Sequence, residues 1–381
     1  LLDRWPSDKT LVAFDMKTGK IIALKMNIFI DGGFYPKSSM GLLLKTLLHA
    51  DSVYNIPNLE INGFVCQTNK VSNAPFRGFG AQNGSLVIEA VTERIQRYLK
   101  DQNQPPDFVK INNFYVENDK TPYGVQLEDV NIMPCWTLIK EKSRYNELRK
   151  CVNAFNAINK YKKRGLAITP VKYGLGIPIP ALKRGSCIIH LLKDGSVLFT
   201  HSGIEVGQGI NTKMCSLISK LLDIPIDLVH VNSTDTLANS EANSTNSGMT
   251  NDVVGFAVID ACKKLNKTIE PYRYNEKHEK RPFKEVVNLA FNAKADLTAH
   301  GVYVSSQEGF NPFTMKGSPY SYYVYGAGVS LAEIDVITGE HKILESHIVF
   351  DAGESLNPGI DIGQVEGGFM QGLGWMSTEE I

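Results

Sequence analysis

Three pairs of strand-like runs, each joined by a short turn containing glycine, constrain the fold of this chain most. The clearest run follows Lys17-Thr18-Gly19, where apolar residues alternate with others as in a strand with one buried face. We expect five apolar side chains to share that face: Ile22, Leu24, Met26, Ile28 and Ile30. Further hairpins are predicted at 187–200 and 329–350, with turns at Lys193-Asp194-Gly195 and Thr338-Gly339.

Helical periodicity alternates with these ribbons. Helices are predicted at 84–100, after Asn211, at 253–265 and, interrupted by glycines, at 362–375. Asn83 is a candidate cap for the first of them.

Ribbons and helices occur on both sides of a polar stretch at about 101–164, which we expect to be a helical linker. The pattern predicts an α/β (α+β) fold with two mixed α/β subdomains, at 1–164 and 165–381. The second is expected to be truncated at its C-terminus. A length of 381 residues is sufficient for two hydrophobic cores.

Composition excludes several classes of protein. The 40 basic and 40 acidic residues leave no net charge for a nucleic acid or an anionic membrane. No apolar run approaches the ~20 residues that span a bilayer. The six cysteines lack CxxC spacing, which argues against a zinc site or an iron–sulfur cluster and suits reduced thiols in the cytosol. The start, Leu1 to Trp5, has neither Met nor a signal peptide, so we expect the sequence to be cut there.

The segment 73–82 is a glycine-rich loop that opens directly onto the first predicted helix. Glycines allow a ligand to approach the backbone, and a helix N-terminus favours an anion. Arg77 adds a forked donor for phosphate or an oxo group. A tight turn with a surface arginine is the equally weighted alternative.

The segment 203–213 again joins a strand to a helix. Gln208, between Gly207 and Gly209, can present amide donors and an acceptor to a planar heterocycle while the loop amides face phosphate. The alternative is a plain strand-to-helix turn. The loop matches neither GxGxxG nor a Walker motif.

Two more segments are ambiguous alone. The polar run 243–252 is typical of a solvated loop with a helix cap. The run 351–374 carries too many glycines for an ordinary helix, which a close helix crossing explains as well as a cofactor does. Hydrolase motifs such as HExxH and GxSxG are absent.

Taken together and in this order, the four segments resemble the molybdenum hydroxylases, the family of aldehyde oxidase and xanthine dehydrogenase. Residues 76–80 match its FRGFG loop, 205–209 its E-x-GQG loop, and 355–367 its SLNPxIDIGQVEG run. The likeness extends over nearly the whole chain.

The resemblance implies a molybdenum–molybdopterin cofactor, whose metal is held by the pterin rather than by Cys or His. Arg77 is then expected beside the molybdenum, with Gly207, Gln208 and Gly209 holding the pterin and its phosphate. A third cofactor loop is expected at Ser247, Gly248 and Thr250, with Ser247 nearest the metal.

The implied activity is an oxidoreductase that hydroxylates aldehydes or N-heterocycles with oxygen derived from water. Lys45 and Ile177 stand where xanthine dehydrogenases carry an Arg and a Phe, while Phe79 is kept. Loss of the guanidinium fork and of one ring disfavours a purine. Xanthine dehydrogenase and a non-catalytic relative that retains the fold as a binding module remain the alternatives.

The family's catalytic Glu lies in a GxGEP segment, which we expect beyond residue 381, so the chain alone is expected to be inactive. Near the start, Leu2-Asp3-Arg4 matches a family motif but is followed by a shortened stretch. The resemblance also implies FAD and two [2Fe–2S] clusters on the full-length enzyme, O2 or NAD as final acceptor, a homodimer, and a cytoplasmic location with peroxisomes as the alternative.

Overall fold

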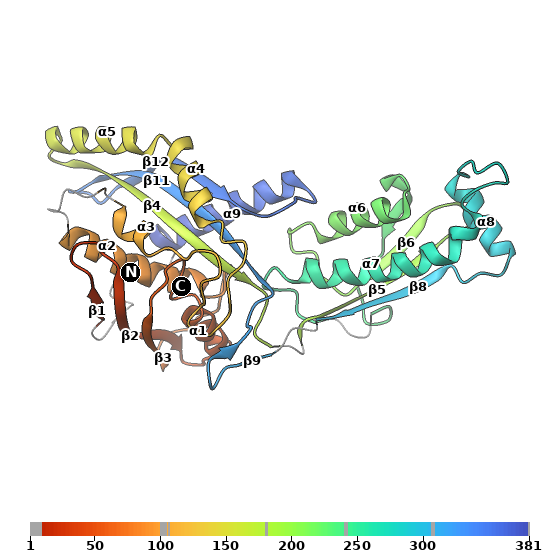
Figure 1. The fold of residues 1–381 in the computed structure, drawn as a ribbon, viewed down its shortest axis with the longest axis horizontal. Coiled ribbons are helices and arrows are strands. Elements are labelled where there is room, and N and C mark those ends of the chain that lie inside the picture. The colour runs from red at the N-terminus through yellow and green to blue at the C-terminus, as the bar shows by residue number, and fades with distance from the viewer. Residues whose placement is uncertain are drawn as a thin grey trace. The chain divides into compact units, whose positions relative to one another are not determined.

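The computed structural model describes residues 10–99, 105, 107–179, 182–239, 243–305 and 309–379. The chain forms two compact units, considered separately below (Figure 1). Unit 1 takes residues up to 174, 311–353 and those from 374 on, and unit 2 takes 175–310 and 354–373. The Leu2-Asp3-Arg4 motif lies outside the described residues.

The first sheet of unit 1 has the order β1-β2-β3. Strands β1 (Leu11–Phe14) and β2 (Ile21–Gly33) pair antiparallel through the predicted turn at Gly19. Strand β3 (Asn58–Gln67) pairs parallel with β2, and helix α1 (Ser39–Leu47) makes the crossover between them. Parallel neighbours require such a crossover.

The predicted apolar face of β2 is wrong at one position. Leu24, Met26 and Ile28 are buried, but Ile22 is 50% exposed and Ile21 is buried in its place. The register shifts by one residue where Phe14 pairs with Ile21 rather than Ile22. Such a bulge reverses the side of the sheet to which the preceding side chains point.

The second sheet of unit 1 joins segments that are distant in the sequence. Its order is β12-β11-β4, with β4 (Lys162–Leu175), β11 (Tyr322–Asp335) and β12 (His341–Phe350). The hairpin β11–β12 confirms the third predicted ribbon. Because β11 pairs with β4, residues 311–353 belong to unit 1, whereas the sequence pattern placed them after a boundary near 165; that boundary stays a prediction for functional subdomains.

The polar segment at 101–164 is more than a linker. It carries three helices, α3 (Phe108–Asn112), α4 (Ile132–Lys142) and α5 (Tyr145–Ile158). Trp136 and Ile139 of α4 are buried in the core of unit 1. The polar composition comes from the outer faces of these helices, so it conceals their buried stripe.

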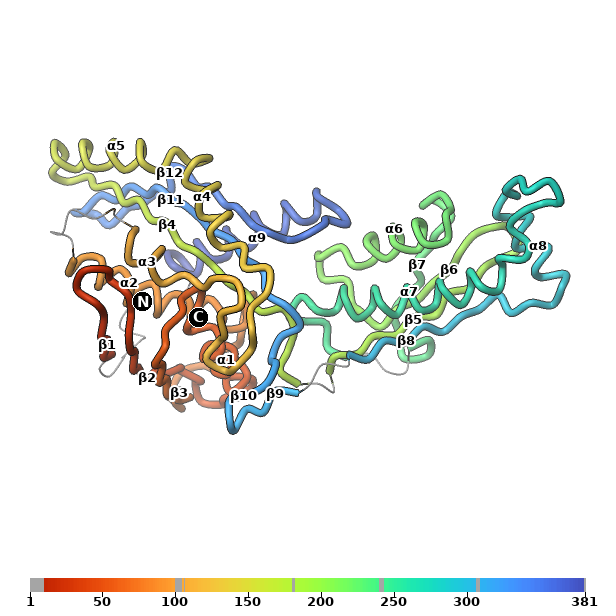
Figure 2. Tube along the Cα trace, viewed as in Figure 1, coloured from red at the N-terminus to blue at the C-terminus, as the bar shows by residue number. Residues whose placement is uncertain are grey.

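Unit 2 is built on a four-stranded sheet of order β7-β6-β5-β8. Strands β5 (Arg184–Leu191) and β6 (Val197–His201) form the second predicted hairpin, and β8 (Thr298–Val304) pairs antiparallel with β5. Helix α7 (Thr250–Ile269) packs on this sheet with α6 (Ile210–Leu222) beside it (Figures 1 and 2). The remaining elements of the described chain, from both units, are β7 (Val229–Val231), η3 (Ile226–Leu228), η4 (Glu270–Tyr272), α8 (Phe283–Asn292), β9 (Phe310–Asn311), β10 (Lys316–Gly317) and α9 (Pro358–Ser377).

Helix α2 (Ala81–Tyr98) begins earlier than predicted. Gly80 occupies its N-cap position, so Asn83 lies inside the first turn and is not the cap. The predicted α/β fold with mixed sheets and helices is otherwise confirmed. No helix in the described part of the chain is long and apolar enough to cross a membrane.

Candidate cofactor-binding loops

The Phe76–Gly80 loop of unit 1 is fixed by backbone contacts with α1. Gly78, Phe79 and Gly80 all have positive φ, at 91°, 50° and 96°. A Cβ on Gly80 would lie 2.6 Å from the Leu42 carbonyl oxygen and 2.7 Å from Thr46 Oγ1. The loop therefore needs glycine both for its conformation and for this close approach.

Within this rigid loop Arg77 is exposed and Phe79 is half-buried. The Phe79 ring lies 3.3 Å from the point where a Cβ on Gly41 of α1 would be. Next to the loop, Gln82 Oε1 and Asn83 Oδ1 are buried and accept no hydrogen bond from the described residues. Buried acceptors of this kind are normally satisfied, so they indicate that a ligand or water donates to them.

Lys45 of α1, predicted to meet substrate, is a buried cation with 3% of its surface exposed. Its Nζ donates to the Gly174 carbonyl at 3.0 Å and lies over the rings of Tyr173 and Tyr320, at 4.5 and 4.3 Å from their centroids. Burial lowers the pKa of Lys45 to about 7.

One turn further along, His49 continues this buried cluster. Its Nε2 accepts from the Gly174 amide at 3.0 Å, so Nδ1 carries the proton and donates to the Lys45 carbonyl at 2.9 Å. Burial holds the pKa of His49 well below its ordinary value, and the charge of Lys45 adds to this effect. No role of His49 or of the two tyrosines could be expected from the sequence alone.

In unit 2, Glu205 organises the turn that precedes α6. Its Oε1 accepts from the amides of Gly207 and Gly209, both at 2.9 Å, and its Oε2 from that of Asn211 at 3.1 Å. Gly209 is the N-cap of α6 and has no side chain, so Glu205 supplies the acceptor that the helix start lacks. From the sequence, Glu205 is known only as the first residue of the E-x-GQG match, and the structure adds its role at the start of α6.

Gln208 lies differently from the prediction. Its Nε2 donates to the Ile204 carbonyl at 2.9 Å and its Oε1 accepts from the Val206 amide at 2.8 Å. The side chain therefore closes its own turn. The amides of Gly207 and Gly209, which were expected to face phosphate, likewise donate to Glu205.

The start of α9 fixes the same turn from the other side. A Cβ on Gly209, which has a φ of 75°, would lie 2.2 Å from Ile360 Cδ1. Gln364 donates to the Gly207 carbonyl at 2.9 Å, and Asp361 pairs with Lys213 of α6 at 3.2 Å. The glycine-rich run at 351–374 thus packs on the E-x-GQG turn.

Replacing Glu205 with Ala should lower the free energy of unfolding by about 1 kcal/mol, the usual effect of losing a helix cap. Desolvation raises the pKa of Glu205, but the three amide bonds outweigh it and hold the pKa below 4.5. A carboxyl group with a lowered pKa stabilises the folded state at pH values above its pKa in the unfolded chain. This stabilisation is lost as the pH falls through its pKa in the folded chain. Chemical denaturation should therefore show the difference shrinking below about pH 4; a difference that persists in acid would contradict the clamp.

His201, at the end of β6, supports this turn and carried no recognisable motif. Its Nδ1 accepts from the Gly203 amide at 3.2 Å, so Nε2 carries the proton and donates to Asn211 Oδ1 at 2.8 Å. Burial lowers its pKa, which keeps the ring neutral.

The third candidate cofactor loop lies beside the candidate substrate residue Ile177. The Ser247 carbonyl accepts from the Gly176 amide at 3.3 Å, and Leu175 Cδ1 lies 3.3 Å from a Cβ position on Gly248. Ser247 and Gly248 both have positive φ, at 57° and 73°. Thr250, 9% exposed, begins α7.

The first turn of α7 also packs on the E-x-GQG side of unit 2. Thr250 Cγ2 lies 3.0 Å from a Cβ position on Gly203. Asn251 Oδ1 is another buried acceptor that no described residue satisfies. Unit 2 therefore gathers the N-terminal ends of α6, α7 and α9 around glycine loops.

These two groups of residues fit a molybdopterin better than a metal bound directly by side chains. The described residues contain no group of three His, Cys, Asp or Glu that could hold an ion. In unit 2, the buried acceptor Asn251 suits the N–H donors of a pterin, and the helix N-termini suit its phosphate. Arg77, Lys45 and Phe79 lie in unit 1, and the other candidate residues lie in unit 2.

Comparison with known proteins agrees with this fit. Family models of the molybdopterin cofactor-binding domain match residues 9–107 and 138–381. Xanthine dehydrogenase/oxidase of Gallus gallus is 38% identical over 366 residues, and aldehyde oxidase 1 of Bos taurus is 37% identical over 366 residues. In both cases the match covers 96% of this chain and 27% of the relative.

Solved structures show the same fold. The aldehyde oxidoreductase from Desulfovibrio desulfuricans is 25% identical with a TM-score of 0.80, over 94% of this chain and 38% of that one. The enzyme from Desulfovibrio gigas has a TM-score of 0.81 at 22% identity, over 95% and 38%. The chain belongs to the molybdopterin cofactor-binding domains of the molybdenum hydroxylase family.

Proposed function

We propose that this chain holds the molybdenum cofactor of an aldehyde-oxidase-like oxidoreductase, which hydroxylates aldehydes or N-heterocycles with oxygen from water. The observation that carries the proposal is the glycine turn at 207–209, fixed between Glu205 and α9 at the start of α6. The family match over residues 138–381 includes this turn. The chain spans about a quarter of its curated relatives, so the activity proposed is that of a longer protein.

We assign the cofactor to three loops. Gly207, Gln208 and Gly209 shape one binding surface, and Ser247, Gly248 and Thr250 shape the next. Arg77, on the rigid loop of unit 1, is assigned to the region of the metal, as is Ser247. When bound, the molybdenum group supplies oxygen transfer and accepts electrons. The chain's own role is to orient that group and keep the site's shape.

Lys45 supports an aldehyde or simple heterocycle over a purine. Its ammonium is occupied by the Gly174 carbonyl and two tyrosine rings, and a lysine cannot form the two parallel hydrogen bonds of a guanidinium. With Ile177 in place of a ring, Phe79 is the one aromatic side chain among the three proposed substrate residues.

We assign the catalytic base to none of the buried carboxylates among the described residues. These are Asp51, Glu89, Asp107 and Glu333, and each lies 2.6–2.9 Å from a Lys or Arg nitrogen. Each of these carboxylates is already paired with a cation, so it is not open to a substrate. A glutamate outside these 381 residues is therefore proposed, together with FAD and two [2Fe–2S] clusters that pass electrons to O2 or NAD in a cytoplasmic homodimer.

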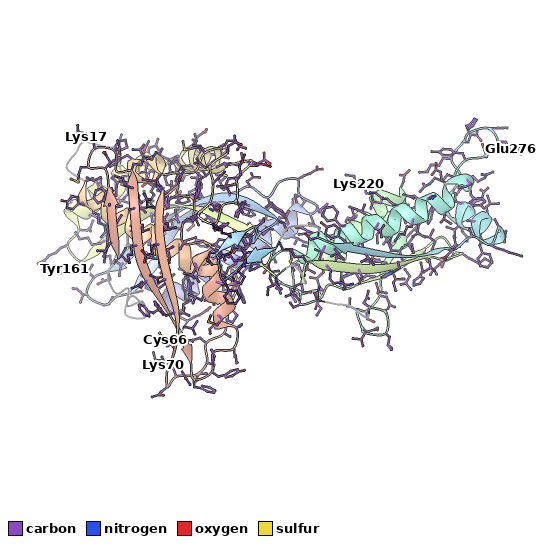
Figure 3. All side chains as sticks on the ribbon, turned by 60° about the horizontal axis from the view of Figure 1, so that its bottom comes forward. Lys17, Cys66, Lys70, Tyr161, Lys220 and Glu276 are labelled. Carbon is purple, nitrogen blue, oxygen red and sulfur yellow. The ribbon has the colours of Figure 1, made fainter. Side chains whose placement is uncertain are left out.

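Arg77→Ala and Gln208→Ala should each lower the molybdopterin content of the full-length protein several-fold, because each removes a group that binds or shapes the cofactor loops. Metal analysis and pterin fluorescence measure this directly. Lys220→Ala is the control, since Lys220 lies on α6 and projects into solvent (Figure 3). Unchanged content in the first two variants would refute the assignment.

An activity assay separates the proposed substrate class from its alternatives. The full-length protein should oxidise an aromatic aldehyde faster than xanthine. Faster turnover of xanthine would contradict the substrate assignment, and a well-folded sample without molybdenum would favour a non-catalytic binding module.

A further inference from the structure

A cavity of about 350 Å³ opens in unit 2 where α8 begins, lined by residues of the 223–225 and 273–286 segments. Its volume lies in the range of small-molecule sites. Asp223, the C-cap of α6, lies on its wall, and thirteen helical residues separate Asp223 from Gly209. At 1.5 Å per residue the cavity is about 20 Å from the cofactor turn.

The lining combines positive charge with an apolar wall. Arg273, Lys280 and Arg281 are the cations, and Asp223 is the one lining carboxylate. The wall between them is made of apolar side chains: Ile224, Pro225, Pro282, Phe283 and Val286. This mixture suits a molecule with one anionic end and an apolar body.

Both arginines are held in place from outside the cavity. Arg273 Nε lies 3.2 Å from Glu270, and Arg281 Nε lies 3.1 Å from Glu285. Arg281 Nη1 donates to the Tyr272 carbonyl at 3.1 Å, while its Nη2 forms no hydrogen bond with the described residues. A fixed guanidinium with an unused edge can bind a carboxylate without further loss of side-chain freedom.

The carboxylate of Asp223 already occupies one of the cations of this cavity. Its side chain is 73% exposed and pairs with Lys280. The hydrogen bond from Lys280 lowers the pKa of Asp223, and the charges of Lys280 and Arg273 add to the effect. Because Asp223 is so exposed, it can leave Lys280 at little cost in packing when another anion arrives.

We propose that this cavity binds a small carboxylate with an apolar body, and that Asp223 competes with it for Lys280. The site is separate from the proposed cofactor function and does not depend on it. The anionic end contacts Lys280 and Arg281, and the body lies on the wall of Phe283 and Val286.

Titration calorimetry on the full chain tests the proposal with three probes: benzoate, the neutral isostere benzamide, and inorganic phosphate. Benzoate should bind, benzamide should bind at least about tenfold more weakly without its charge-assisted bonds, and phosphate should also be weaker because it has no apolar body. Absent benzoate binding, or equal affinity for either of the other probes, would overturn the ligand class.

Two substitutions at the surface test the residues. Lys280→Gln should weaken benzoate binding about fivefold, and Asp223→Asn should strengthen it by a similar factor, given what exposed ion pairs contribute. Lys277→Gln is the matched control, in the same loop beside Glu276, which extends into solvent (Figure 3). Equal effects of Lys280→Gln and Lys277→Gln would contradict the site, and an unchanged affinity in Asp223→Asn would contradict the competition.

Discussion

Gly84→Ala should lower the free energy of unfolding by about 3 kcal/mol, the upper range for overpacking. A Cβ at this position would lie 2.5 Å from the Thr46 carbonyl oxygen, 2.9 Å from the Ala50 nitrogen and 2.9 Å from the His49 carbonyl carbon. These are backbone atoms, which cannot turn aside as a side chain can. Alanine's higher helix propensity recovers only about 1 kcal/mol, so the clash prevails.

Denaturant unfolding followed by tryptophan fluorescence measures this loss, since Trp136 is buried in unit 1. Gly165→Ala is the control, because its added Cβ would meet nothing within 4 Å and should change stability by less than about 0.5 kcal/mol. Equal stability of the two variants would show that α1 and α2 are not packed this closely. Thr46, whose carbonyl oxygen meets this Cβ, also donates through its hydroxyl to the Gly80 carbonyl of the Arg77 loop, so Gly84→Ala should also lower cofactor content.

The fold could be predicted where the pattern is local. The hairpins at 187–200 and 329–350 were predicted because a turn with glycine fixes the register of both its strands. The exposure of Ile22 could not be predicted, because the bulge depends on pairing with β1 rather than on the alternation within β2. The pairing of β11 with β4 joins strands about 150 positions apart, and no local signal encodes it.

For the candidate site, the sequence predicts where the glycine loops lie, because glycine is required wherever positive φ and close approach coincide, as at Gly80 and Gly209. The side chains around them could not be predicted: the sequence suggested that Gln208 faces a ligand, whereas the structure shows it bonded to its own turn. A carboxylate such as Glu205 gives no sequence signal that it caps a helix five residues ahead.

The burial of Lys45 and the lowering of its pKa could not be predicted from the sequence alone. Its position on α1 indicated only a cation near substrate. The structure places the amine over the rings of Tyr173 and Tyr320 and within hydrogen-bond distance of the Gly174 carbonyl. The ring faces favour the ammonium, but desolvation outweighs them and lowers the pKa to about 7.

The sign of the resulting pH dependence follows from proton binding. Between about pH 7 and 10.5 the unfolded chain keeps the Lys45 proton while the folded chain has lost it, so the free energy of unfolding rises with pH across this window. Lys45→Met removes the titration and retains much of the volume. The free energy of unfolding of Lys45→Met, measured relative to that of the natural chain, should therefore fall by about 3 kcal/mol between about pH 6 and pH 9.5.

Urea unfolding at both pH values measures that change, with Lys70→Met as the control because Lys70 is an exposed lysine of the same unit (Figure 3). Since the control shares the same background of titrating tyrosines and cysteines, any difference between the two variants comes from the site of substitution. A difference that does not vary with pH would mean that Lys45 reaches solvent. In that case the amine would be available to substrate, and the argument against a purine would lose its structural support.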